Sequence, residues 1–191
     1  VSEVIIHELE DIRSRYGDER RTEIVLSSED IDIEDMIVEE DMVVTFSHSG
    51  YVKRNPVTLY KSQRRGGKGK VGMGTKEEDF VEKIFIANTH QYILIFTNRG
   101  RLYWLKVYQI PQAGRAAKGK AIVNLIQMNP GERVAAILPV RSFEDGKSVV
   151  MVTRKGIIKK TGIEAYSNPR ASGIIAISID DGDELIDVQM T

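Results

Sequence analysis

The stretch from residue 60 to residue 70 concentrates the residue types that bind phosphate. It holds five Lys or Arg side chains and three glycines within eleven positions. Arg and Lys supply positive charge and hydrogen-bond donors, and glycine lets backbone N–H groups approach an anion because it has no Cβ. These residues predict an anion-binding loop, although a solvated basic loop without a specific function has the same composition. The candidate contact residues are Gln63, Arg64, Arg65, Gly66, Gly67, Lys68, Gly69 and Lys70.

The charges of the chain are divided unequally along its length. Residues 1–42 carry 15 acidic and 4 basic side chains, whereas residues 43–191 carry 23 basic and 13 acidic side chains. A local basic field attracts a polyanion even though the net charge of the whole chain is only -1. Nucleic acid is therefore the first partner that the charge pattern predicts.

The composition argues against several other classes of protein. The 191 residues include no cysteine, which excludes disulfides and thiolate metal sites and fits a reducing compartment such as the cytoplasm. No apolar run approaches the roughly 18 residues that a membrane-spanning helix needs, so we expect a soluble protein with no membrane partner. The chain begins with Val1 and stops within a repeating pattern, so we expect it to be a piece of a longer protein.

Several patterns approach the motifs of catalytic or metal sites without completing them. Residues 67–72 match G-x-G-x-x-G, but no helix-forming sequence follows them. Residues 114–120 match the start of a P-loop, but Ala121 stands where a Ser or Thr must hold the metal, and residues 180–184 fit a turn better than a calcium loop. No acid or nucleophile stands at a useful spacing from His7, His48 and His90. We predict no catalytic residue, metal site or cofactor in this segment.

Apolar residues near the N-terminus repeat with the period of a helix. One stripe of a 3.6-residue period is formed by Ile5, Leu9, Ile12 and Tyr16. We predict a short helix that stops at Gly17, within a tail segment at residues 1–23, and an acidic linker at residues 24–42. A solvated linker with one short amphipathic turn is the simpler interpretation of the acidic segment. The sharper hypothesis is that it competes with DNA for the basic part of the chain.

From residue 43 onward the apolar pattern changes to that of β-strands. Runs of β-branched and aromatic residues, each broken by a polar turn that closes on glycine, predict three hairpins with turns at Gly50, Gly100 and Gly156. A second glycine with a strand behind it follows each hairpin, at Gly69, Gly119 and Gly173. A period near 50 residues with about four short strands is typical of propeller blades. We predict an all-β, propeller-like domain over residues 43–191, with three repeats and, at residues 185–190, the opening strand of a fourth.

Basic residues recur with the same period as the hairpins. If the repeats are equivalent, these bases form a curved rim on which duplex DNA can bend, held through its phosphates. Aromatic residues of the second repeat lie within strands, so we interpret Tyr92, Phe96, Tyr103 and Trp104 as core rather than as a platform for stacking bases. The candidate rim bases are Lys53, Arg54, Arg99, Arg101, Arg115, Lys118, Lys120, Lys155, Lys159 and Arg170.

The seven residues from Gln63 to Gly69 resemble, letter for letter, the box that marks the C-terminal domains of DNA gyrase A subunits. The neighbouring residues 49–54 and the 50-residue repeat fit the same family. Residues 16–24 resemble the junction where the cleavage core and coiled-coil arm of those proteins end, so the resemblance covers essentially the whole chain. It implies a β-pinwheel, of which this chain would supply the first three blades and the edge of the fourth.

The resemblance also implies a function. Domains of this family wrap duplex DNA around their rim, so that a holoenzyme with two A subunits and ATP-hydrolysing B subunits introduces negative supercoils. Its catalytic residues, ATP and magnesium belong to other domains, and its implied location is the bacterial cytoplasm, in association with the nucleoid. Two alternatives remain: the related domain of topoisomerase IV, whose box is degenerate or absent, and a non-enzymatic propeller that binds proteins.

Overall fold

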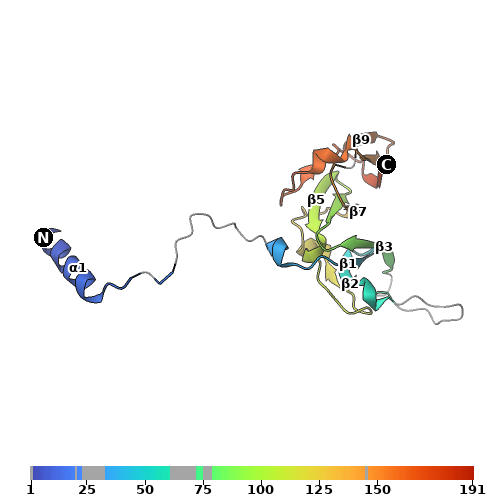
Figure 1. Cartoon of the computed structure of the whole chain (residues 1–191). Coiled ribbons are helices and arrows are strands. Elements are labelled where there is room, and N and C mark those ends of the chain that lie inside the picture. Colours follow the sequence, from blue (N-terminus) through green and yellow to red (C-terminus); the bar gives the residue numbers. More distant parts are fainter. Residues whose placement is uncertain (1, 20, 23–32, 61–71, 75–78, 145) are drawn as a thin grey trace. The chain divides into compact units, whose positions relative to one another are not determined.

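The computed structural model describes residues 2–19, 21–22, 33–60, 72–74, 79–144 and 146–191. The chain divides into two units, Val1–Met36 and Ile37–Thr191. In the first unit, α1 spans Ser2–Tyr16 and ends where the backbone N–H of Gly17 donates to the carbonyl of Arg13 at 2.8 Å (Figure 1). The predicted N-terminal helix is confirmed. A short 3-10 turn, η1, follows within the acidic segment at Ile33–Met36.

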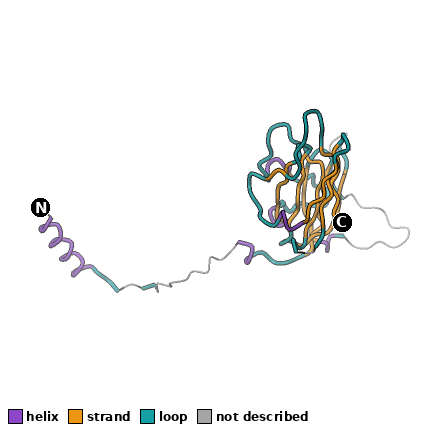
Figure 2. Tube along the Cα trace, turned by 90° about the horizontal axis from the view of Figure 1, so that it is seen from above, coloured by secondary structure: helices purple, strands orange, loops and turns teal. Residues whose placement is uncertain are grey.

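The second unit consists of strands in three antiparallel sheets (Figure 1; Figure 2). The sheet orders are β3-β1-β2-β6, β10-β5-β4-β7 and β11-β8-β9. The strands are β1 (Asp41–Ser47), β2 (Tyr51–Pro56), β3 (Val81–Asn88), β4 (Tyr92–Thr97), β5 (Arg101–Lys106), β6 (Lys120–Ala121), β7 (Val134–Val140), β8 (Ser148–Thr153), β9 (Ile158–Gly162), β10 (Ile174–Ile175) and β11 (Leu185–Met190). Four further 3-10 turns are η2 (Val57–Leu59), η3 (Val107–Gln109), η4 (Ile122–Asn124) and η5 (Ile163–Tyr166). The predicted all-β architecture is confirmed.

Each predicted hairpin forms around its turn glycine. Gly50, Gly100 and Gly156 have φ angles of 79°, 76° and 90°, in the left-handed region where glycine is favoured. Gly100 is also constrained by space, because a Cβ at this position would lie 2.1 Å from the carbonyl oxygen of Ile177. The three turns therefore depend on glycine for its backbone conformation, as the repeat pattern predicts.

The outermost strand of a sheet comes from the following repeat. β6, in the second repeat, pairs with β2 of the first sheet, and β10, in the third repeat, pairs with β5 of the second sheet. The crossing chain comes so close that a Cβ at Gly119 would lie 2.3 Å from the carbonyl oxygen of Val52. A blade in space is thus not the same as a repeat in sequence.

Residues 185–190, predicted to open a fourth repeat, instead complete the third sheet. They form β11, which pairs antiparallel with β8 and occupies the same place as β3 beside β1 and β7 beside β4. In the connectors before β7 and β11, Gly131 and Gly182 adopt φ angles of 82° and 72°, and the strand that follows each connector pairs with the first strand of its own hairpin. The prediction of a fourth repeat at this strand is therefore wrong.

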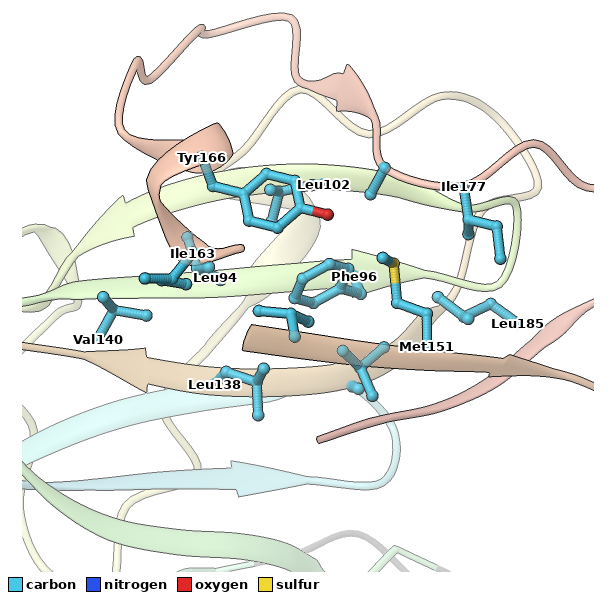
Figure 3. Close-up of a cluster of buried hydrophobic side chains, with 14 of the residues drawn as sticks. Leu94, Phe96, Leu102, Leu138, Val140, Met151, Ile163, Tyr166, Ile177 and Leu185 are labelled. Carbon is cyan, nitrogen blue, oxygen red and sulfur yellow. The ribbon is translucent and has the colours of Figure 1, made fainter. Parts of the chain in front are cut away.

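Two hydrophobic clusters hold the sheets together. Alternate residues of the second sheet serve different clusters: Ile93 and Tyr103 face the first sheet, whereas Leu94 and Trp104 belong to the cluster shared with the third sheet. Figure 3 shows Leu94, Phe96, Leu138 and Val140 in one cluster with Met151 and Leu185 of the third sheet, with Phe96 beside Met151. Because both faces of β4 and β5 are buried, their sequences are continuous apolar runs. The interpretation of Phe96, Tyr103 and Trp104 as core residues is confirmed, and Tyr92 packs against the core while partly exposed.

Candidate nucleic-acid interface

The anion-binding loop predicted at residues 63–70 lies outside the described residues, but the chain that follows it is described. Met73 is buried, and a Cβ at Gly74 would lie 2.4 Å from the carbonyl oxygen of Ala116. The backbone at Gly74 is therefore packed against the loop at residues 113–117, which crosses from the second repeat to the first sheet.

Two of the predicted rim bases hold this crossing loop instead of facing solvent. Lys53 is 0% exposed, and its Nζ donates to the carbonyls of Gly114, at 3.1 Å, and Arg115. Burial, assisted by the charge of Arg115, lowers the pKa of Lys53. Arg54 is half-buried and its Nε donates to the carbonyl of Ile110 at 2.6 Å. The burial of Lys53 removes it from the candidate interface, because its ammonium group cannot reach a phosphate while it holds the loop.

The loop that Lys53 and Arg54 support brings three other predicted bases to the edge of the first sheet. Lys120 lies on β6 and is exposed, while Arg115 and Lys118 are partly exposed. The Nζ of Lys118 lies 3.8 Å from the centroid of the Tyr51 ring, a cation–π contact that fixes the side chain on the outer strand pair. Because β6 of the second repeat pairs with β2 of the first sheet, these three cations from the second repeat lie at the edge of the first sheet.

The equivalent crossing loop of the third repeat places basic side chains beside the second sheet. Arg170 is exposed in the loop before Gly173, and the Nη2 of Arg101 donates to the carbonyl of Ser172 in the same loop at 2.6 Å. Arg99 is exposed in the hairpin turn. A cavity of about 410 Å³ lies here, lined by Arg99, Arg101, Asn129 and Ser178 among others. Arg99 and Arg101 thus line one cavity of the second blade, and Arg101 also binds the loop that carries Arg170.

In the third sheet the predicted bases Lys155 and Lys159 are both exposed. Each donates through Nζ to a backbone carbonyl, Lys155 to Asp181 at 2.8 Å and Lys159 to Ala176 at 2.6 Å. A lysine ammonium has three donors, so two remain for a phosphate in each case. Two further exposed cations, Arg154 and Arg133, are compensated because both pair with Glu184, at 3.1 Å and 3.4 Å.

Three acidic residues that the sequence did not single out support the hairpins. Asp79 and Asp183 accept hydrogen bonds from the turn N–H groups of Ser49 and Lys155, each at 2.9 Å. Glu132, at the equivalent place in the second repeat, accepts from the hydroxyl of Tyr103 at 2.8 Å. An available signal was the acid directly after the connector glycine, in Gly131-Glu132 and Gly182-Asp183.

The structure also bears on the motifs that were set aside. Residues 114–120 form the crossing loop and enter β6, whereas a P-loop would precede a helix. Residues 180–184 form the predicted turn, in which the N–H of Asp183 donates to the carbonyl of Asp180 at 3.0 Å. Among the described residues there is no cluster of three His, Asp or Glu side chains able to hold a metal ion. None of the described helices is long and apolar enough to cross a membrane.

Comparison with known proteins gives a consistent family. The family model described as DNA gyrase C-terminal domain, beta-propeller, matches residues 41–88, 91–141 and 147–191. The DNA gyrase A subunit of Salmonella typhimurium is 57% identical over 189 residues, which are 99% of this chain and 22% of that protein. The corresponding protein of Haemophilus influenzae is 56% identical, again over 99% of this chain and 22% of the relative. The chain thus spans about a fifth of the length of these relatives.

Solved structures support the same fold. The C-terminal domain of DNA topoisomerase IV superposes with a TM-score of 0.70 and 29% identity, covering 82% of this chain and 47% of that one. A DNA gyrase A C-terminal domain superposes with a TM-score of 0.62 and 26% identity, covering 80% of this chain and 48% of that one. The match to each spans about half of the solved domain.

Proposed function

This chain belongs to the DNA gyrase C-terminal domain, beta-propeller family, and on that premise we propose that it binds and bends duplex DNA as part of a DNA gyrase A subunit. The proposal rests on one observation: equivalent crossing loops carry exposed basic side chains, around Lys120 in the second repeat and Arg170 in the third. Successive blades would then offer cations to successive stretches of one duplex. DNA held in this way is bent around the domain.

Binding of this kind depends on phosphates rather than on base sequence. Each phosphate that a Lys or Arg neutralises releases counterions, so affinity falls with salt by a slope of about 0.9 per contact. Residues 63–68 precede Gly69 as residues 113–118 precede Gly119, so we place the loop at Gln63–Lys70 in the same set of DNA contacts. Its cations Arg64, Arg65 and Lys68 would contact phosphates of the same duplex.

We assign the wider context to the whole protein. The DNA-bending part spans residues 43–191, the acidic linker residues 24–42 and the tail of the cleavage core residues 1–23. A second A subunit, the gyrase B subunit, ATP and magnesium would complete the supercoiling enzyme, and this segment itself would contribute no catalytic residue. The location would be the bacterial cytoplasm, on the nucleoid.

A ligation experiment tests the proposal. The 191-residue chain is added to nicked circular DNA, the nick is sealed, the protein is removed and the linking number is read on a gel. A positive change that disappears with the Arg64→Ala/Arg65→Ala double variant supports wrapping that depends on the loop. Binding to duplex DNA without a linking-number change would limit the function to binding, and a chain that does not bind DNA would favour a protein-binding propeller.

Topoisomerase IV is the second candidate, because its C-terminal domain gives the higher TM-score, 0.70 against 0.62. The sequence favours gyrase, since gyrase A subunits reach 57% identity and the topoisomerase IV domain 29%. The two are separated by replacing the corresponding segment of a full-length gyrase A protein with this chain's sequence. Retained ATP-dependent negative supercoiling supports the gyrase assignment, whereas relaxation without supercoiling supports topoisomerase IV.

A further inference from the structure

The hairpin turn of the third sheet is fixed by a buried acid at its base. Asp183 is 1% exposed, and its Oδ1 accepts hydrogen bonds from the backbone N–H groups of Lys155, at 2.9 Å, and Glu184, at 2.8 Å. The backbone N–H of Arg154 donates to the carbonyl of Glu184 at 2.8 Å. The turn that carries Lys155 is thus tied at two points to the segment that leads into β11.

The same attachment occurs in the first sheet, but there the turn has no cation at its tip. Asp79 Oδ1 accepts from the N–H groups of Ser49, at 2.9 Å, and Phe80, at 3.0 Å. The backbone N–H of His48 donates to the carbonyl of Phe80 at 2.9 Å, as Arg154 does to Glu184. Position for position, Asp79 corresponds to Asp183 and Ser49 corresponds to Lys155. The attachment is therefore a repeated structural device.

The second sheet keeps the backbone bond, from the N–H of Asn98 to the carbonyl of Arg133 at 2.9 Å, but its carboxylate departs from this pattern. Glu132 Oε2 accepts from the Tyr103 hydroxyl at 2.8 Å and from the backbone N–H of Asn129 at 2.9 Å, and Oε1 lies 3.8 Å from the Nε of Arg101. The longer side chain reaches past the turn to the strand behind it. Here the carboxylate orients Arg101 rather than the backbone of the turn.

We propose that Asp183 is a positioning residue for DNA binding, which holds the backbone of Lys155 so that this exposed lysine meets a DNA phosphate. The inference rests on the proposed function and deepens it. A negative side chain inside a basic surface acts here by ordering a turn, because its Oδ1 accepts hydrogen bonds from the backbone N–H groups of Lys155 and Glu184. The Nζ of Lys155 also donates to the carbonyl of Asp181 at 2.8 Å, so both ends of the lysine are held.

The attachment is tested first without DNA, by amide hydrogen exchange in the 191-residue chain. Asp183→Ala should speed exchange of the Lys155 N–H about five- to tenfold, the effect of losing one hydrogen bond. Asp183→Asn keeps a side-chain oxygen that accepts from the same N–H groups and should restore slow exchange. If Asp183→Ala does not fold, Asp183→Ser serves, because its shorter side chain cannot span to the turn. Unchanged exchange in the folded variant would overturn the attachment.

The role in binding is tested by the salt dependence of affinity for a short duplex at pH 8. Asp183→Ala and Lys155→Gln should each reduce the slope by about 0.9, the value of one phosphate contact, and the double variant should reduce it no further. Asp79→Ala is the matched control, since it loosens a turn without a cation and should leave the slope unchanged.

Two results would contradict the positioning role. One is a normal slope for Asp183→Ala while Lys155→Gln lowers it, and the other is an equal loss for Asp79→Ala, which would indicate general destabilisation. A normal slope for Lys155→Gln would show that Lys155 does not contact a phosphate. This result would overturn the inference while leaving the proposed function in place. A wild-type chain that does not bind the duplex would instead overturn the proposed function, while the exchange data would still report the attachment.

Discussion

Equivalent faces of the first two sheets are built from different chemistry. The second sheet presents Leu105 to the cluster it shares with the first sheet, together with Ile93 and Ile95. At the equivalent place on β2 the first sheet has Asn55, with Lys53 and Thr45 on the same face, and all three are 0% exposed. The same strand pattern therefore supports an apolar interface in one blade and a buried polar one in the next.

The difference follows from what covers each face. The second sheet packs against side chains of the first, so apolar residues serve it best. The polar face of the first sheet lies against the crossing loop, where the carbonyls of Ala113, Gly114 and Arg115 need donors. Asn55 Nδ2 donates to Ala113 and Lys53 donates to the other two. A buried cation is stable there because backbone carbonyls replace its water.

The largest loss of stability is expected when a polar side chain is placed on the apolar face of the second sheet. Leu105→Asn removes a side chain that is 3% exposed and buries an amide with no loop to receive it, at a cost of about 4 kcal/mol in the free energy of unfolding. Urea unfolding followed by the fluorescence of Trp104 measures the loss. Leu105→Met is the control and should cost less than about 1.5 kcal/mol. Equal unfolding midpoints for the two variants would contradict the claim that this face of the second sheet requires an apolar side chain.

The reverse exchange should cost somewhat less. Lys53→Met keeps the volume but removes the donor to the carbonyl of Arg115 and one of the two donors to the carbonyl of Gly114, so we expect a loss of about 3 kcal/mol. The matched control is Lys120→Met on exposed β6, which should change the free energy of unfolding by less than about 0.5 kcal/mol. A Lys53→Met chain as stable as the control would show that the polar face does not support the loop.

Trp104 makes one of several polar contacts that hold the crossing in the third repeat, so the loss of this contact should cost less again. Trp104 Nε1 donates to the carbonyl of Tyr166 at 2.8 Å, and Trp104→Phe removes this donor and part of the ring volume. We expect a loss of about 2 kcal/mol, measured by thermal unfolding with circular dichroism because the only Trp is gone. A loss as large as that of Lys53→Met would show that the two crossings are held equally.

At Lys118, on the first crossing loop, a substitution should change DNA binding more than it changes the stability of the fold. Lys118→Gln removes the cation over Tyr51 and should cost about 0.5 kcal/mol in the free energy of unfolding. The same variant should lower the salt slope of DNA binding by about 0.9, because one phosphate contact is lost. An unchanged slope would limit Lys118 to a structural role.

The smallest effect is a dependence of stability on pH. Burial first, and then the charge of Arg115, lowers the folded-state pKa of Lys53 below its usual value of 10.5. Between these two values the unfolded chain binds the proton more often, so the free energy of unfolding rises as pH increases through that window. Lys53→Met should lack this rise in urea unfolding at alkaline pH, and identical curves for both proteins would contradict it.

The local sequence pattern predicted the hairpins well and the role of individual basic residues less well. The glycines at 50, 100 and 156 require φ > 0 for their own turns, a property of neighbouring residues that the sequence displays directly. The burial of Lys53 depends on a loop about 60 residues later, at Gly114 and Arg115. Nothing local distinguishes Lys53 from exposed Lys120.

The sequence by itself determined the three hairpins, their glycine turns, the apolar runs of the buried middle sheet and the uneven distribution of charge. All of these follow from period, turn chemistry and composition within short windows. Only the tertiary structure decided which strand completes which sheet and which cations remain outside. Strand exchange places β6 beside β2 and β10 beside β5, and β11 returns to β8. Such pairings are set by packing between distant segments, where a buried charge is stable only if another part of the chain supplies its hydrogen bonds.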